Sequence, residues 1–180
     1  MPYVAPGTVA AGDVYTAAAH NIQVNNVIAL QSAIRRLDYQ ASTATYTIST
    51  TMTNLATAPE VFTAADVSFT ADGTSSYAVE FYYPQIVCAT NAGYNIWIVL
   101  CKGDGTALGT LANVTGNTGQ RLPGGVFKFF YTPAAGTQTL NVRCVQETGG
   151  GNGSLPQGAT TGYTGSFTPM YLAVYGPQQL

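Results

Sequence analysis

Apolar and polar residues alternate in short runs along most of the chain after residue 45. The clearest run spans residues 77–83, where every second residue is a large apolar or aromatic one. A period of two is typical of a strand with one buried face. One side of this strand would carry Tyr77, Val79, Phe81 and Tyr83, and the other Ala78, Glu80 and Tyr82. Pro84 is predicted to end it.

A second run, Ile96–Cys101, is almost wholly apolar, which favours a strand buried on both faces. The residues that follow, Lys102-Gly103-Asp104-Gly105, contain the Asp-Gly pair of a tight hairpin turn. Residues 108–111 would begin the returning strand. We therefore predict that Tyr77–Leu111 forms a β-hairpin core around which the rest of the chain is organised.

Similar runs predict five further strands. They lie within residues 46–52, 60–71, 126–131, 140–145 and 170–175, and a glycine-rich loop spans 146–169. About eight short strands separated by turns, without a further helix, are typical of a sandwich. The predicted fold is mainly β: an extended arm and one helix, then an eight-stranded antiparallel jelly-roll β-sandwich over residues 41–180.

The first 40 residues have a different pattern and are predicted to form an anchor. Residues 1–15 are rich in Pro, Gly and Ala and should be extended, and Thr16 is a suitable N-cap for a helix over Ala17–Tyr39. The helix could pack on its own β-domain, or it could join copies of itself in a short bundle; both stay open. Its heptad stripe comprises His20, Gln23, Val27, Leu30, Ile34 and Leu37, of which Val27, Leu30, Ile34 and Leu37 are the candidate assembly interface.

Charged residues are scarce. They make up 8% of the 180 residues, against about 25% in ordinary soluble domains, so Thr, Ser, Asn, Gln and Gly must cover the surface. Such surfaces suit extracellular β-proteins, fibres and subunits that bury their exterior in an assembly. Six scattered basic residues give no footprint for nucleic acid. No apolar run reaches 18 residues, and the first residues do not have the pattern of a secretion signal, so we expect neither a membrane span nor export.

The three cysteines, Cys88, Cys101 and Cys144, lie in or beside strand-like runs, where a free thiol behaves as a small apolar group. An odd number excludes complete pairing within one chain, and the spacing fits no zinc motif. A single bridge, Cys88–Cys101 or Cys101–Cys144, stays open.

No catalytic constellation is found. The sole histidine, His20, lies outside the β-domain, which disfavours Ser-His and Cys-His chemistry. Glu80 and Glu147 could serve a glycosidase only if they converged in one cleft. The simpler interpretation of Glu80 is a surface charge, or one paired with Arg143 or Lys128. Asp72-Gly73 and Asp104-Gly105 suggest turns. We expect no enzyme activity, no cofactor and no metal.

Aromatic residues offer one binding hypothesis. Exposed rings can stack on a sugar or on another subunit, whereas packing in the core or an interface is the commoner use. The candidates for glycan stacking are Tyr82, Tyr94, Trp97 and Tyr163; Tyr171 and Tyr175 are further aromatics of the same kind.

Two segments resemble structural proteins of tailed-bacteriophage virions. The opening, with Pro6-Gly7, Gly12-Asp13 and Thr16-Ala17-Ala18 leading to Asn21 and a helix ending Ala29-Leu30, is similar to their Pro-rich arm and "G-D-x-x-T-A-A" helix. His20 replaces a bulky apolar residue. Tyr77–Pro84 and the hairpin after it resemble the "Y-x-V-E-F-x-A-P" strand of phage jelly-roll domains in head-decoration, fibre and tail proteins, with Tyr83 in place of a small residue.

This resemblance implies a virion subunit assembled in the host cytoplasm. The arm and helix would dock on other virion proteins, and the sandwich would be displayed outward, commonly as a trimer. The place on the particle, whether capsid decoration, fibre or tail, is left open. The alternative function is a carbohydrate-binding or host-receptor-binding module; a small sandwich enzyme is a third hypothesis.

Overall fold

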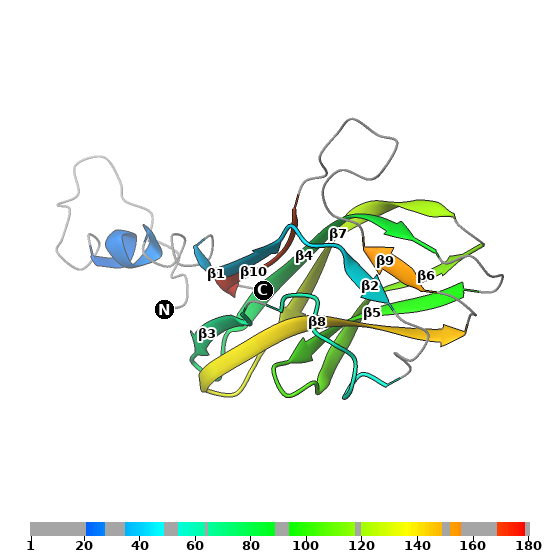
Figure 1. The fold of residues 1–180 in the computed structure, drawn as a ribbon. Coiled ribbons are helices and arrows are strands. Elements are labelled where there is room, and N and C mark those ends of the chain that lie inside the picture. Colours follow the sequence, from blue (N-terminus) through cyan, green and yellow to red (C-terminus); the bar gives the residue numbers. More distant parts are fainter. Residues whose placement is uncertain are drawn as a thin grey trace.

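The computed structural model describes residues 21–27, 35–48, 54–63, 65–88, 94–117, 120–148, 152–155 and 169–178. Within these ranges the chain forms a short helix over 21–27 and ten strands (Figure 1). The strands are β1 (Arg36–Ser42), β2 (Tyr46–Ile48), β3 (Val67–Ala71), β4 (Ser76–Val87), β5 (Tyr94–Lys102), β6 (Ala107–Gly116), β7 (Arg121–Tyr131), β8 (Gly136–Thr148), β9 (Gly153–Leu155) and β10 (Met170–Gln178).

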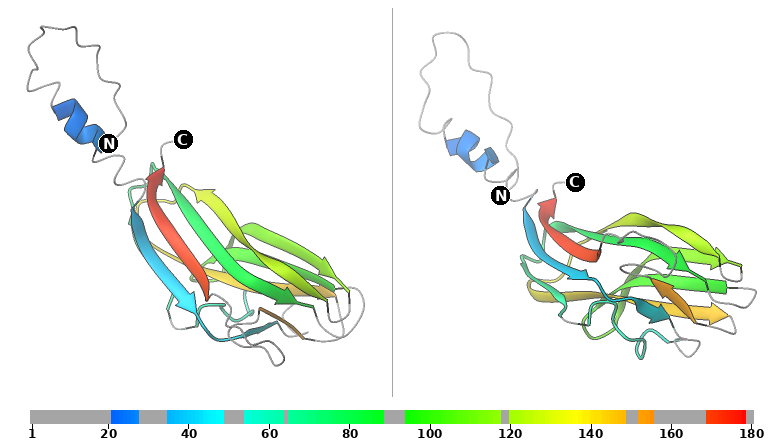
Figure 2. Two further views of the ribbon diagram at one scale, coloured as in Figure 1. Left: turned by 90° about the horizontal axis from the view of Figure 1, so that it is seen from above. Right: turned by 45° about the horizontal axis from the view of Figure 1, so that its top comes forward.

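Two antiparallel sheets form a sandwich. One contains β1-β10-β4 with β7 on the other side of β4, and the short pair β9-β2 continues it; the other has the order β3-β8-β5-β6. Figure 2 (left) shows β1, β10, β4 and β7 side by side as one layer. Without the short β2 and β9, the strand order is that of a jelly roll. The predicted fold class is confirmed.

The core lies between the sheets and follows the predicted alternation. Tyr77, Val79, Phe81 and Tyr83 of β4 are buried and belong to one apolar cluster. Facing them from the second sheet are the inward residues of β5 and β8, namely Ile96, Ile98, Leu100, Leu140, Val142 and Cys144. Each fully buried large side chain contributes about 1.5–3 kcal/mol, so this cluster is the main source of stability.

All eight predicted strands are present, with two differences in detail. β5 and β6 form the expected hairpin, closed by the turn in which the Gly105 N–H donates to the Lys102 carbonyl. β4, however, belongs to the opposite sheet, so Tyr77–Leu111 is not one hairpin unit. β4 also continues through Pro84 to Val87. There it lies so close to β7 that a side chain at Gly124 would collide with the Tyr83 carbonyl oxygen, and only glycine fits.

The predicted end of the N-terminal helix is wrong. Residues 36–39 belong to β1, which pairs with β10 from Arg36↔Tyr175 to Ser42↔Met170. Leu37 therefore lies in a strand rather than a helix, and it packs against the sandwich core. A register shift between Arg36 and Asp38 accompanies the placement of Leu37 on the core side, although Tyr39, two residues later, is exposed. Helix propensity is a weak preference, and pairing with β10 outweighs it here. β1 also crosses the predicted boundary at residue 40; the division into anchor and displayed domain stays a prediction.

The described part of the helix, residues 21–27, lies apart from the sheets in Figures 1 and 2. Val24 and Val27 are exposed on it, and Asn26 is buried. Leu30, Ile34 and the arm lie outside the described residues. Among the helices described, none is long and apolar enough to cross a membrane.

Candidate functional site

The outer face of the larger sheet carries a row of aromatic side chains, which we call the tyrosine face. Tyr171 of β10 lies between Tyr39 of β1 and Tyr82 of β4, with ring centroids 5.7 Å and 5.4 Å away. The Arg36 guanidinium lies 4.5 Å from the centre of the Tyr39 ring and extends the row to the sheet edge. These rings come from strands distant in sequence, and the β1-β10-β4 register brings them together.

The tyrosine face continues across β7, where it is apolar and open. Val126 pairs with Tyr82, and Phe130 pairs with Ala78, so both side chains point outward beside the tyrosines. Val126 is 52% exposed and Phe130 is 49% exposed, although the solvent face of a sheet usually carries polar side chains. The face therefore leaves Tyr39, Val126 and Phe130 in contact with water, and apolar side chains grouped on one face are typical of interaction sites.

A single acid–base pair lies in the middle of the described part of this face. Glu80 of β4 accepts a hydrogen bond of 2.8 Å from the Tyr171 hydroxyl and lies 3.3 Å from the Lys128 ammonium. Of the alternatives that the sequence left open for Glu80, the structure shows the pairing with Lys128, whereas Arg143 pairs with Glu60. Burial, and next the bond to Glu80, raise the pKa of Tyr171 well above its usual value, so its phenol stays a hydrogen-bond donor. The pair neutralises its own charge, so Arg36 at the sheet edge leaves the face with only a small net charge.

The outer face of the smaller sheet carries the second feature, a groove of about 410 Å³ that we call the Trp97 groove. Trp97 and Val99 of β5 point into it, on the side opposite to the core residues Ile96 and Ile98. β6 and β8 supply the sides, and Leu55 closes it from the loop before β3. The lining residues are Leu55, Trp97, Val99, Ala107, Leu108, Gly109, Thr110, Val145 and Gln146.

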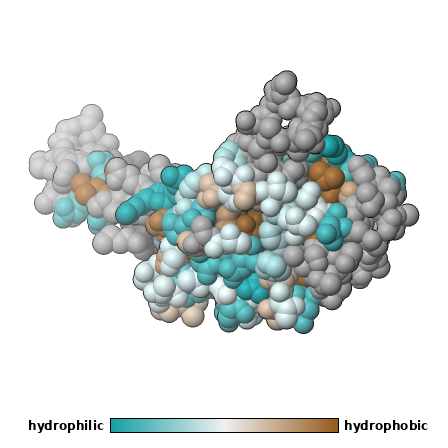
Figure 3. Space-filling model, in the orientation of Figure 1, coloured by the Kyte–Doolittle hydropathy of each residue, from teal (hydrophilic) through white to brown (hydrophobic). Residues whose placement is uncertain are grey.

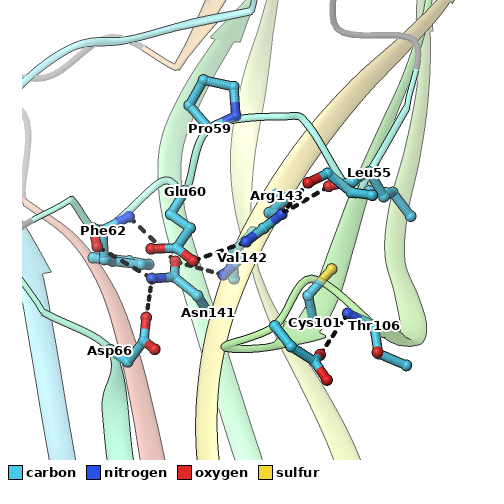
Figure 4. A network of polar contacts seen from close by, with 12 residues as sticks. Leu55, Pro59, Glu60, Phe62, Asp66, Cys101, Thr106, Asn141, Val142 and Arg143 are labelled. Atoms are coloured by element: carbon cyan, nitrogen blue, oxygen red, sulfur yellow. Dashed lines mark hydrogen bonds and ion pairs between the residues drawn. The ribbon is translucent and has the colours of Figure 1, made fainter.

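Arg143 of β8 holds the loop that carries Leu55 (Figure 4). Its Nη1 donates to the carbonyl oxygens of Leu55 and Ala56 at 2.9 and 3.2 Å, and its Nη2 lies 2.9 Å from the Glu60 carboxylate. Two residues earlier, Asn141 accepts a hydrogen bond from the Phe62 amide and donates to the Phe62 carbonyl and to Asp66. The loop is thus tied to β8 on both sides, and the groove wall has a fixed position.

Gly105 explains how the β5–β6 turn fits beside this network. Its φ is +86°, a conformation that favours glycine, and a Cβ there would lie 2.5 Å from Arg143 Nη1. The neighbouring Asp104 accepts a hydrogen bond from the Thr106 amide, which lowers the pKa of its carboxyl group. Asp72 likewise accepts bonds from Ser75 and Thr74 at the β3–β4 turn. Both aspartates have the turn role that the sequence indicates.

The structure places the predicted aromatics in different surroundings. Trp97 lines the groove on the smaller sheet, whereas Tyr82 lies on the larger sheet, where Tyr171 covers one face of its ring. Tyr94 begins β5, with only its backbone described, and Tyr163 lies outside the described residues. Nothing in the sequence singled out Leu55, which sits in a loop, or Tyr39, which the predicted helix included.

Candidate chemistry is sparse. Cys88, Cys101 and Cys144 are free and buried, and burial raises the pKa of each thiol. Within the described ranges, no group of three or more His, Cys, Asp or Glu side chains is placed to hold a metal ion. The face shown in Figure 3 is mostly of intermediate to hydrophilic colour with small hydrophobic patches, which agrees with the low charge content.

Comparison with known proteins gives distant structural similarities. No family model matches the chain, and no curated protein matches it. Among solved structures, the infectious bursal disease virus Gt strain is similar at 17% identity and a TM-score of 0.40; the match covers 80% of this chain and 38% of that one. The family 35 carbohydrate-binding module from Clostridium thermocellum is similar at 14% identity and a TM-score of 0.29, over 77% and 98% of the two chains.

A third similar structure is the carbohydrate-binding module CBM6cm-2 from Cellvibrio mixtus lichenase 5A in complex with cellotriose, with 13% identity, a TM-score of 0.28 and coverage of 81% and 99%. The chain spans little more than a third of the viral chains it resembles. The function proposed below therefore rests on this chain's own residues.

Proposed function

We propose that the protein is a non-enzymatic structural subunit of a bacteriophage particle, and that copies of the sandwich associate through the tyrosine face as a trimer. The observation that carries this proposal is the exposed aromatic and aliphatic area on β1, β10, β4 and β7. Tyr, Phe and Arg are enriched at the centres of interfaces, and Lys and Glu are depleted there. The tyrosine face shares the enrichment in Tyr, Phe and Arg, and its one Glu and one Lys, Glu80 and Lys128, are paired with each other.

The charges of the face favour a second copy of the same chain as its partner. A strongly charged face would repel its own copy, whereas Glu80 and Lys128 neutralise each other here. Tyr171 has Tyr39 on one side and Tyr82 on the other, so the row offers a ligand mainly ring edges. Stacked rings whose rotamers are already fixed lose little entropy on association, which suits a protein contact better than a sugar platform.

The N-terminal region supplies the proposed contact with other virion proteins. The likeness of residues 3–30 to phage arms and helices supports it, and so do Val24 and Val27, which are exposed on the described helix. The particle would be assembled in the host cytoplasm, where free Cys88, Cys101 and Cys144 stay reduced. Deleting residues 1–34, which spares β1, should leave a folded sandwich that no longer joins the particle; a deletion variant that joins normally contradicts this anchor role.

The trimer is tested by placing a charge on the face. Phe130→Glu introduces an uncompensated carboxylate at the 49% exposed Phe130 without entering the core, and should shift the mass in solution from trimer to monomer. Thr137→Glu, an exposed residue of β8 on the other sheet, is the matched control and should keep the trimer. A trimer that persists in Phe130→Glu at all concentrations would place the interface elsewhere.

A further inference from the structure

The Trp97 groove lies on the sheet opposite to the tyrosine face, so it would stay open when that face is buried between copies. It is concave, and its volume of about 410 Å³ falls within the range of small-molecule sites, roughly 300–1,000 Å³. The wall of the groove at Leu55 is held in place because the buried Arg143 side chain donates a hydrogen bond to the Leu55 carbonyl oxygen. A preformed groove of this size suits a compact ligand better than a protein surface.

The lining indicates the chemistry of that ligand. An aromatic indole and aliphatic side chains form the floor, and none of the nine lining residues carries a charge. Arg143, which lies opposite the lining residue Val99 in the β5–β8 register, is already engaged by Glu60 and two carbonyl groups, so it would not attract an anion. The ligand should therefore be uncharged and should offer an apolar surface to the indole.

The rim adds neutral polar groups. Thr110 lines the groove and is exposed. Asn113 lies directly opposite Trp97 in the β5–β6 register, so its exposed side chain is on the same face of the sheet as the Trp97 indole. β6 is also the last strand in the order of its sheet. An aromatic floor with hydroxyl and amide groups at its edge matches a pyranose ring, which has an apolar C–H face and a rim of hydroxyl groups.

We propose that the Trp97 groove binds a neutral sugar ring of a surface polysaccharide, with the ring face on the Trp97 indole and its hydroxyl groups at Thr110 and Asn113. The site would give the particle subunit a glycan-binding activity that its assembly does not require. It is independent of the trimer, because every residue it uses belongs to the smaller sheet or to the loop at Leu55.

The chain contains a single tryptophan, so its fluorescence reports on the groove directly. We would titrate the full chain with cellohexaose, maltohexaose, mannohexaose and chitohexaose, and with oligogalacturonate as the charged comparison. A saturable change with at least one neutral oligosaccharide, and a weaker one with oligogalacturonate, is expected. No saturable change with any of the neutral sugars, or binding of oligogalacturonate alone, would overturn the proposal.

Variants then locate the site by calorimetry with the sugar that binds. Trp97→Ala and Thr110→Arg should each weaken binding by about tenfold or more. In Thr110→Arg the long arginine side chain would fill the groove. Because Thr110 is exposed, this variant should still fold, and it keeps the proposal testable if Trp97→Ala does not fold. Thr137→Arg, an exposed threonine of β8 outside the groove, should bind as the unmodified chain does. Unchanged affinity of Thr110→Arg for the sugar would overturn the site. The mass of Thr110→Arg in solution should equal that of the unmodified chain, so that a result on sugar binding can be distinguished from a result on the trimer.

Discussion

The contact between Arg143 and Glu60 should show strong energetic coupling, and losing either partner should have different consequences because the two side chains differ in exposure. Arg143 is 9% exposed and Glu60 is 30% exposed in their side chains. When Arg143 is removed, Glu60 can turn towards water. When the charge of Glu60 is removed, the guanidinium stays buried with neutral partners only, among them the carbonyl groups of Leu55 and Ala56. Removing one partner of a fully buried pair costs about 3–5 kcal/mol, which is an upper bound here.

From this geometry we expect Glu60→Gln to lower the free energy of unfolding by about 2 kcal/mol, since the amide can still accept the bond but no longer offsets the charge. Arg143→Met should cost about 2–3 kcal/mol, because three hydrogen bonds are lost while the desolvation cost of the guanidinium disappears. In the Arg143→Met background, Glu60→Gln should be almost neutral, within about 0.5 kcal/mol. The double variant thus costs less than the sum of the two single variants.

The assay is urea unfolding followed by circular dichroism, at one fixed protomer concentration because association would add to the apparent stability. Lys102→Met, at an exposed lysine, is the control and should change stability by less than about 0.5 kcal/mol. Additive effects of the two substitutions, or a cost of Arg143→Met no larger than that of the control, would refute the account of the network.

Three other predictions concern the core, the β5–β6 turn and the buried cysteine thiols. Phe81→Ala should cost about 3–5 kcal/mol in urea unfolding, since Phe81 is fully buried; a loss below about 1 kcal/mol would contradict its place in the core. Gly105→Ala should lower the melting temperature more than Gly136→Ala does, because both have positive φ but only Gly105 faces Arg143; equal losses would exclude that clash. Stability should fall as pH rises above about 8.5, because burial raises the folded-state pKa of the thiols of Cys88, Cys101 and Cys144, and unfolding then favours their ionisation; a melting temperature constant from about pH 7 to 10 would contradict this.

The strands could be predicted from the sequence because their signal is local. A period of two in residues 77–83 gives both the strand and its buried side, and the structure buries Tyr77, Val79, Phe81 and Tyr83 as expected. β9 could not be predicted, since Gly153–Leu155 is a three-residue strand within a glycine-rich segment. The end of the helix could not be predicted because Leu37 continues the helical stripe, whereas its place in a strand depends on pairing with β10 and on a register shift between Arg36 and Asp38.

The pairing of strands and the surfaces they build depend on contacts distant in sequence. That β4 and β5 lie in opposite sheets follows from the whole jelly roll, not from the turn between them. Trp97 could be identified as a candidate because it is one of the aromatic side chains that can stack on a sugar. Leu55 could not, because its place in the groove depends on Arg143, 88 residues away along the chain.

The mass of the unmodified protein in solution, measured by light scattering at several concentrations, tests the central claim most directly. If the tyrosine face joins three copies, the mass should be about 56 kDa, three times the 18.8 kDa of one chain, and it should persist on dilution. A mass of 18.8 kDa at every concentration would contradict the account, because Val126, Phe130 and the tyrosine row would then remain exposed to water.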